Sequence, residues 1–215
     1  MSKKRKDFHR ASKTFDSIAD HFDKTRKMPW DEVVEFLEGC QGRLLDMGCG
    51  NGRHMVEGLE KGCEVVGIDA STHLLEISRK NIEEKVKVLS RVELLRSNVK
   101  NLPFVDRCFD SVIYVATLHH LKEGRVKSLK EAKRVLKIGG KILVSSWARE
   151  LDRWDLDKGE REVMVPWHRE DGEVVERFYH LYTLEELAKD VEKSGLSVEE
   201  SFHSEGNNYV TAEKI

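Results

Sequence analysis

The stretch LLDMGCGNG at positions 44–52 constrains the fold of this chain more than any other segment. An apolar run leads into a turn in which glycine recurs at positions 48, 50 and 52. Glycine adopts backbone angles that other residues avoid, and it lets a ligand come close to the chain. The segment therefore predicts a buried strand that ends in a tight turn at a binding site.

Short apolar runs alternate with amphipathic stretches along the chain, which predicts an α/β fold with helices covering a sheet. Ser71 is expected to cap one helix, and Gly139-Gly140 are expected to end another. Strands are expected at 42–48, 63–69, 91–98, 109–116, 141–147, 197–204 and 207–215, and helices at 53–61, 74–85, 126–140 and 183–195.

Residues 161–182 interrupt this alternation. Two apolar-rich runs flank the sequence REDG, which predicts a β-hairpin with an Asp-Gly turn. The hairpin follows the fifth strand, and ligands of open parallel sheets bind beyond the carboxyl ends of the strands. We therefore expect the insertion to be a lid or a platform for an acceptor molecule.

The chain has 215 residues and a net charge of −2. This length fits one domain, expected at 14–215 and preceded by a basic, flexible tail at 1–13. The net charge does not indicate nucleic acid, but segments 1–13 and 122–141 are both rich in Lys and Arg. They are either solvated surfaces or one basic face that meets phosphates.

The four cysteines show no C-x-x-C spacing, so we expect reduced thiols and no metal site. The basic N-terminus lacks the apolar core of a signal peptide, and no apolar run is long enough to span a bilayer. These features predict a soluble cytoplasmic protein.

The residues around the turn narrow the choice of ligand. Asp69 ends the second expected strand, where a carboxylate can accept hydrogen bonds from two ribose hydroxyls. Dinucleotide sites have the pattern G-x-G-x-x-G, whereas this turn reads D-x-G-x-G-x-G. The acidic Asp46 disfavours a pyrophosphate and suits an ammonium or a sulfonium. A tight turn without a ligand is the structural alternative.

The segments DMGCGNG, GIDAS and SNVKNLPFVDRCFDSVIYVATLHHL resemble the class I S-adenosylmethionine-dependent methyltransferases. The resemblance implies a Rossmann-like sheet that is mostly parallel, with an antiparallel last strand and helices on both faces. It also implies S-adenosylmethionine as cofactor. The cofactor-binding residues that follow from it are Arg26, Asp46, Gly48, Gly50, Asp69, Ala70, Asn98, Val99 and Ala116.

Four further segments, FDSIADHFDKTRKMPW, VPWH, RFYHLY and EGNNYV, resemble the tRNA methyltransferases that esterify carboxymethyluridine at the wobble position. This resemblance implies the tRNA anticodon loop as substrate. It also implies a heterodimer with a small zinc-binding activator protein along the third strand. The chain departs from the family at Asn208 and Tyr209, because the family often has Trp after the first Asn.

A carboxylate acceptor is ionised at neutral pH, so the site needs positioning more than a general base. A few hydrogen-bond donors should serve better than several strong ion pairs, which would stabilise the ground state. The candidate catalytic residues are Arg26, Trp30, His119, His168, Arg177 and His180. Each has a structural alternative, such as core packing for Trp30.

Two other functions fit the same motifs. One is a methyltransferase for a small molecule such as a quinone, which would need a base and an apolar pocket. The other is a scaffold that binds the cofactor without catalysis. The polar hairpin with its His and Arg residues argues against the first, and the intact glycine turn argues against the second.

Overall fold

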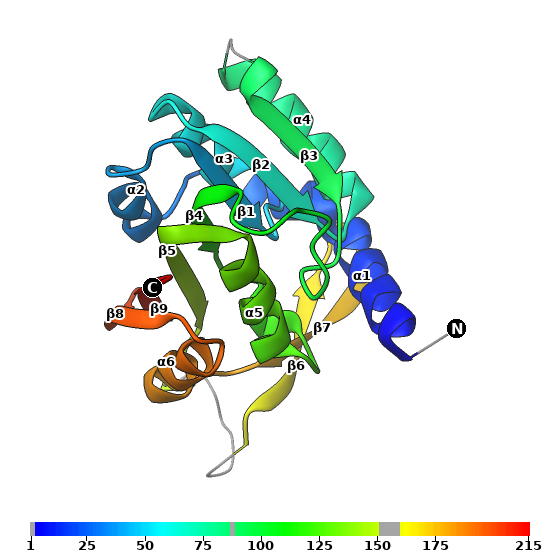
Figure 1. Ribbon diagram of the computed structural model, residues 1–215. Helices are drawn as coiled ribbons and strands as arrows, with labels where there is room; N and C mark the ends of the chain where they lie inside the picture. Colours follow the sequence, from blue (N-terminus) through cyan, green and yellow to red (C-terminus); the bar gives the residue numbers. More distant parts are fainter. Residues whose placement is uncertain (1–2, 87–88, 151–159) are drawn as a thin grey trace.

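The structure is a computed structural model that describes residues 3–86, 89–150 and 160–215. Its main sheet has seven strands in the order β3-β2-β1-β4-β5-β9-β8 (Figure 1). The five strands from β1 to β5 are parallel, and β9 is antiparallel to both β5 and β8. The predicted fold class is thus confirmed. The strands are β1 (Arg43–Met47), β2 (Glu64–Asp69), β3 (Val92–Arg96), β4 (Phe109–Tyr114), β5 (Leu136–Trp147), β8 (Ser197–Ser204) and β9 (Asn207–Glu213).

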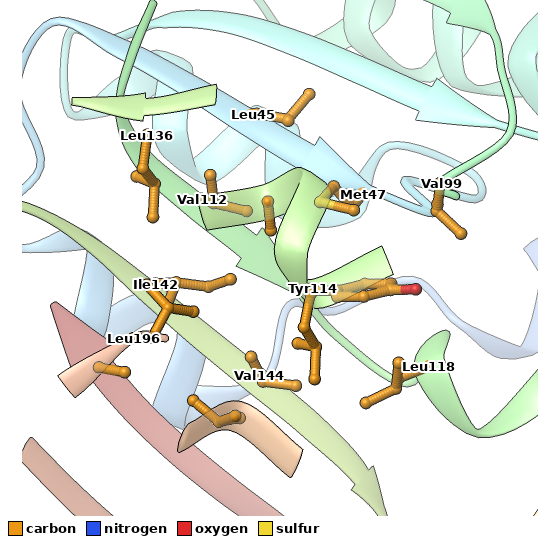
Figure 2. Close-up of a cluster of buried hydrophobic side chains, with 14 of the residues drawn as sticks. Leu45, Met47, Val99, Val112, Tyr114, Leu118, Leu136, Ile142, Val144 and Leu196 are labelled. Carbon is orange, nitrogen blue, oxygen red and sulfur yellow. The ribbon is translucent and has the colours of Figure 1, made fainter. Parts of the chain in front are cut away.

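Alternate residues of the strands build a separate core on each face of the sheet, because side chains alternate along a strand. On one face, Leu45, Tyr114 and Val144 belong to a cluster that includes residues of α5 (Arg125–Val135) and α6 (Leu184–Lys193) (Figure 2). On the other face, Leu44 and Ile113 pack with α2 (Asp31–Leu37), α3 (Arg53–Glu60) and α4 (Thr72–Lys85). Helices therefore cover both faces, as predicted.

The helix ends agree with the sequence at one site and differ at another. The hydroxyl of Ser71 accepts a hydrogen bond from the Leu74 N–H at 3.0 Å, which confirms the predicted cap. The prediction that Gly139-Gly140 end α5 is wrong, because the helix ends at Val135. The two glycines lie within β5, where a Cβ at Gly140 would approach the backbone oxygen of Asp110 to 2.9 Å.

The predicted hairpin is confirmed. Strands β6 (Glu162–His168) and β7 (Val174–His180) pair antiparallel in a sheet of their own. Gly172 in the turn has φ +86°, a conformation that favours glycine.

Helix α1 (Lys3–Thr25) begins inside the segment that we expected to be a tail, so residue 13 marks no break in secondary structure. Flexibility of the first turns, and a single domain from residue 14 onwards, stay predictions. The helix runs beside β7 (Figure 1). Asp16 in α1 accepts hydrogen bonds from the Ser71 hydroxyl at 2.6 Å and the His73 N–H at 3.1 Å. The helix is thereby fixed to the start of α4.

The cysteines are free in the structure. Cys40 and Cys63 are distant in sequence, yet their sulfur atoms lie 3.0 Å apart in the core. Among the described ranges we find no group of three His, Cys, Asp or Glu side chains that could hold a metal ion. In those same ranges, no helix combines the length and the apolar character that crossing a bilayer requires.

Gly48→Ala should destabilise the protein by about 2 kcal/mol or more, because the variant residue would have to adopt a positive φ. Gly48 has φ +87°, and an added Cβ would lie 2.2 Å from the hydroxyl oxygen of Thr117. Gly39→Ala is the matched control, since a Cβ there meets no atom within 4 Å. Thermal unfolding of both variants measures the effect, and equal melting temperatures would contradict this account of the turn.

Candidate active site

A cavity of about 210 Å³ opens at the carboxyl ends of the parallel strands. The glycine turn after β1 and the end of β2 form its floor, and α1 covers it. The segment after β3, the segment after β4 and strand β7 of the hairpin complete the walls. The insertion after β5 therefore lies at the ligand side of the sheet, as the sequence predicted.

Backbone hydrogen bonds hold the glycine turn against the end of β2. The N–H groups of Gly48 and Cys49 both donate to the Ile68 carbonyl, at 2.7 and 3.0 Å. The Gly50 N–H donates to Asp69 Oδ2 at 3.0 Å, and the Ser71 N–H donates to Asp69 Oδ1 at 2.8 Å. These bonds fix the Asp69 carboxylate at the cavity wall. Its remaining lone pairs can accept hydrogen bonds from ribose hydroxyls.

Asp46 lies in the core next to the turn, and it does not line the cavity. It is 1% exposed, and its Oδ2 has no hydrogen-bond partner. Burial, followed by the nearby charge of Asp69, raises the pKa of Asp46 to about 8. A cation bound in the cavity would favour the ionised form, so this orphaned carboxyl fits a sulfonium or ammonium ligand and not a pyrophosphate.

The other predicted cofactor residues, Ala70, Asn98, Val99 and Ala116, all line the cavity. Ala116 has φ +48°, an unfavourable angle for a residue with a Cβ, and its N–H donates to the Ser145 hydroxyl at 3.1 Å. Asn98 Oδ1 accepts the Lys100 N–H at 3.0 Å, so its side chain also caps the local turn. Backbone strain such as that at Ala116 is typical of binding sites.

Arg177 is a buried cation that forms no ion pair with any residue in the described ranges. Its guanidinium lies 4.6 Å from the Trp167 ring, 5.2 Å from the Tyr179 ring and 6.0 Å from the Trp147 ring. It donates to the Tyr179 hydroxyl at 2.7 Å, whereas its Nε has no partner, and no described carboxylate pairs with it. Burial, and then the charge of Arg26, lower the pKa of Arg177. An unpaired buried charge is costly, so this site favours an anionic ligand.

Positive charge dominates the cavity although the chain carries a net charge of −2. Arg26 lies 5.6 Å from the Trp167 ring, the same ring that Arg177 contacts. Burial, followed by the charge of Arg26, lowers the pKa of Arg53 to about 10. Among the described residues, the charged side chains at the wall are Arg10, Arg26, Arg53, Lys100, Lys122 and Arg177 against Asp69 and Glu176.

Two adjacent histidines line the cavity as neutral rings. Burial lowers the pKa of His119 well below its usual value, and it lowers the pKa of His120 to about 3. His119 Nδ1 accepts the Trp147 N–H at 3.1 Å, so the ring hydrogen must lie on Nε2. His120 Nδ1 lies 3.0 Å from the Phe178 carbonyl and must donate to it. His119 can therefore donate a neutral hydrogen bond to a ligand.

The structure places three predicted acceptor residues outside the cavity. His180 is buried and contacts Glu186 Oε1 at 2.9 Å through Nε2, because it follows Tyr179 on the strand and its ring turns towards α6. His168 is exposed at the end of β6. Trp30 packs against Arg53 and the adjacent core. We therefore do not expect Trp30, His168 or His180 to contact an acceptor directly.

The sequence analysis did not predict that helix α1 covers the cavity. Phe8, Phe15 and Phe22 line the cavity, and they recur at intervals of seven residues, which places them on one side of a helix. That spacing was the available signal. Tyr209, the aromatic residue in the last motif, is fully buried and stacks on Phe202 at 5.2 Å, so it cannot stack on a ligand.

Comparisons with known proteins agree with this site. A family model described as a methyltransferase domain matches residues 45–144. A protein of Encephalitozoon cuniculi that is named as a methyltransferase is 33% identical, over 93% of each chain. A tRNA (carboxymethyluridine(34)-5-O)-methyltransferase of Arabidopsis thaliana is 36% identical over 64% of this chain and 32% of that protein. The CcbJ methyltransferase of Streptomyces caelestis has a TM-score of 0.77 at 17% identity, over 95% of this chain and 98% of that chain.

The chain belongs to the class I S-adenosylmethionine-dependent methyltransferase family. Fold, glycine turn and sequence similarity all agree on this assignment. The chain spans less than half the length of the first curated tRNA methyltransferases that it matches. The geometry of the site is therefore the main guide to the acceptor of the methyl group.

Asp46→Asn should raise the melting temperature more at pH 9 than at pH 6. The folded protein holds the Asp46 proton up to a pKa of about 8, whereas an unfolded aspartate loses it near its ordinary pKa of 3.8. This group therefore costs stability progressively as pH rises from about 4 to about 8, and the neutral amide removes that cost. Thermal unfolding at the two pH values tests the sign, and an equal shift at both would contradict the burial of an unpaired carboxyl.

Proposed function

We propose that this protein transfers a methyl group from S-adenosylmethionine to the carboxylate of 5-carboxymethyluridine at the tRNA wobble position. The observation that carries the proposal is the unpaired Arg177 guanidinium, buried between three aromatic rings at the wall of the cavity. A carboxylate is the acceptor that such a group would bind. The curated relatives named as tRNA (carboxymethyluridine(34)-5-O)-methyltransferases support this choice.

The cofactor would lie along the glycine turn. Asp69 would accept the ribose hydroxyls, the wall at Asn98 and Val99 would border the adenine, and Arg26 would hold the amino-acid carboxylate. Once bound, the cofactor supplies an electrophilic methyl group on a positively charged sulfur. Ala116 would lie near that sulfur, where its strained backbone allows close approach.

The acceptor would lie between the cofactor and the hairpin. Arg177 would bind one carboxylate oxygen through its guanidinium, which lines the cavity, and the Nε2–H of His119 would donate to the same group. One delocalised cation and one neutral donor orient the acceptor without binding it so tightly that its nucleophilicity is lost. The aromatic rings around Arg177 exclude water from the reacting atoms.

The pH dependence separates this proposal from a small-molecule methyltransferase that acts on a phenol. A carboxylic acid has a pKa near 4, and His119 stays neutral, so kcat at saturating cofactor should be flat from about pH 6 to 8.5. A phenol with a pKa near 10 would instead make log kcat rise by about one per pH unit in that range. Such a slope would support the small-molecule alternative.

Arg177→Gln should lower turnover on tRNA by about 100-fold or more, because the acceptor loses its charged partner. The dissociation constant for S-adenosylmethionine should stay within about twofold, which also shows that the variant is folded. Arg161→Gln is the matched control, since Arg161 precedes the same hairpin but pairs with Glu186 at 3.4 Å. Unchanged turnover in Arg177→Gln would move the acceptor site elsewhere.

A small zinc-binding activator along β3 is part of the same proposal. Strand β3 lies at the edge of the sheet, and Val92 and Leu94 line a small groove between it and α4, together with the charged Arg79 and Glu83. An edge strand suits pairing with a strand of a partner. We also propose a cytoplasmic location, where such a substrate would be met.

Leu94→Arg should abolish stimulation of methyl transfer by a recombinant zinc-binding activator, because the long charged side chain would fill the groove at β3. Glu93→Arg, at an exposed neighbouring position, should leave the stimulation intact. Equal stimulation of both variants would contradict an activator at this edge.

A further inference from the structure

Three cations at the mouth of the cavity have no acidic partner among the side chains that the structure describes. Arg10 lies on α1, Lys100 lies between β3 and β4, and Lys122 lies between β4 and α5. Arg10 and Lys122 are exposed, and Lys100 is half-buried. Lys100 Nζ lies 3.4 Å from the backbone oxygen of Glu123, and none of the three forms an ion pair with a described residue. Their charges are thus available to a ligand at the mouth.

Three other basic residues of segment 122–141 form ion pairs. Arg134 contacts Glu131 and Asp106, Lys137 contacts Asp110 at 2.7 Å, and Lys141 contacts Glu199 at 3.0 Å. Lys137 and Lys141 lie in the amino-terminal half of β5, whereas the cavity lies at its carboxyl end. The charges of these three residues are therefore compensated, and Lys137 and Lys141 lie apart from the cations at the mouth.

Apolar side chains lie among these cations. Lys122 Nζ lies 5.0 Å from the Phe178 ring, and Met164 on β6 is 43% exposed. Both Phe178 and Met164 line the cavity. Unpaired cations next to exposed apolar surfaces match single-stranded nucleic acid, in which phosphates and unstacked bases alternate.

We propose that Arg10, Lys100 and Lys122 bind the phosphodiester groups of the RNA nucleotides that flank the acceptor base. Phe178 and Met164 contact a neighbouring unstacked base. This inference rests on the proposed function, and it assigns the contacts that hold the RNA loop while the acceptor base enters the cavity. A free nucleoside would make none of these contacts.

The test compares Lys100→Gln/Lys122→Gln with the wild-type protein in binding an anticodon stem-loop RNA that carries 5-carboxymethyluridine. Dissociation constants are measured by fluorescence anisotropy at several salt concentrations. Loss of two phosphate contacts should reduce the slope of log K against log salt by about 1.4, since each single-strand contact contributes about 0.7. The KM for tRNA should rise, while kcat and the affinity for S-adenosylmethionine should not change.

Lys137→Gln/Lys141→Gln is the matched control, because it removes the same charge at the other end of β5 and should keep the wild-type slope. Arg10→Gln should reduce the slope by about a further 0.7 when added to the first pair. If the wild-type protein methylates tRNA but both double variants share its slope, the assignment of the mouth is overturned and the proposed function stands. If the wild-type protein binds no RNA, both are overturned.

Discussion

The site depends on the contact between the glycine turn after β1 and the end of β2. The Gly48 N–H donates to the Ile68 carbonyl and the Gly50 N–H donates to the Asp69 carboxylate, so the turn cannot move without breaking its bonds to the end of β2. The same bonds orient the Asp69 carboxylate towards the cavity wall. Because the parallel strands all end at this edge, the walls after β3 and β4 and the inserted hairpin meet there as well.

The charges around the cavity are arranged in two parts. On the side of the turn lies a buried acid, Asp46, whose pKa is raised by burial and by the nearby charge of Asp69. On the side of the hairpin lies a buried cation, Arg177, which has no counter-ion in the part of the chain that the structure describes. Each group costs stability in the free protein and would be compensated by a ligand of opposite sign. A cationic methyl donor and the proposed carboxylate acceptor would satisfy both, and methyl transfer between them would neutralise charge within the site.

Sequence patterns were sufficient for the sheet, the turn and most of the cofactor wall, because these depend on local periodicity and on glycine. They were insufficient where the contacts are formed by segments distant in sequence. His180 was predicted to meet the acceptor, but strand alternation turns it towards Glu186 on α6. Helix α1 begins within a basic segment that was expected to be a tail, and it covers the cavity through phenylalanines that only the folded helix aligns. Three basic residues of segment 122–141, namely Arg134, Lys137 and Lys141, form ion pairs that no local pattern predicts.

The most direct test of the account is the chemical stability of the product. The protein, with and without a zinc-binding activator, is given S-adenosylmethionine labelled in the methyl group and tRNA stripped of base-labile esters, and the product is treated with mild alkali. A methyl ester on the wobble carboxymethyluridine predicts that label enters tRNA and is released by the alkali. Label that stays on the tRNA would mean a carbon, nitrogen or ribose acceptor, and it would contradict the assignment of Arg177 to a carboxylate.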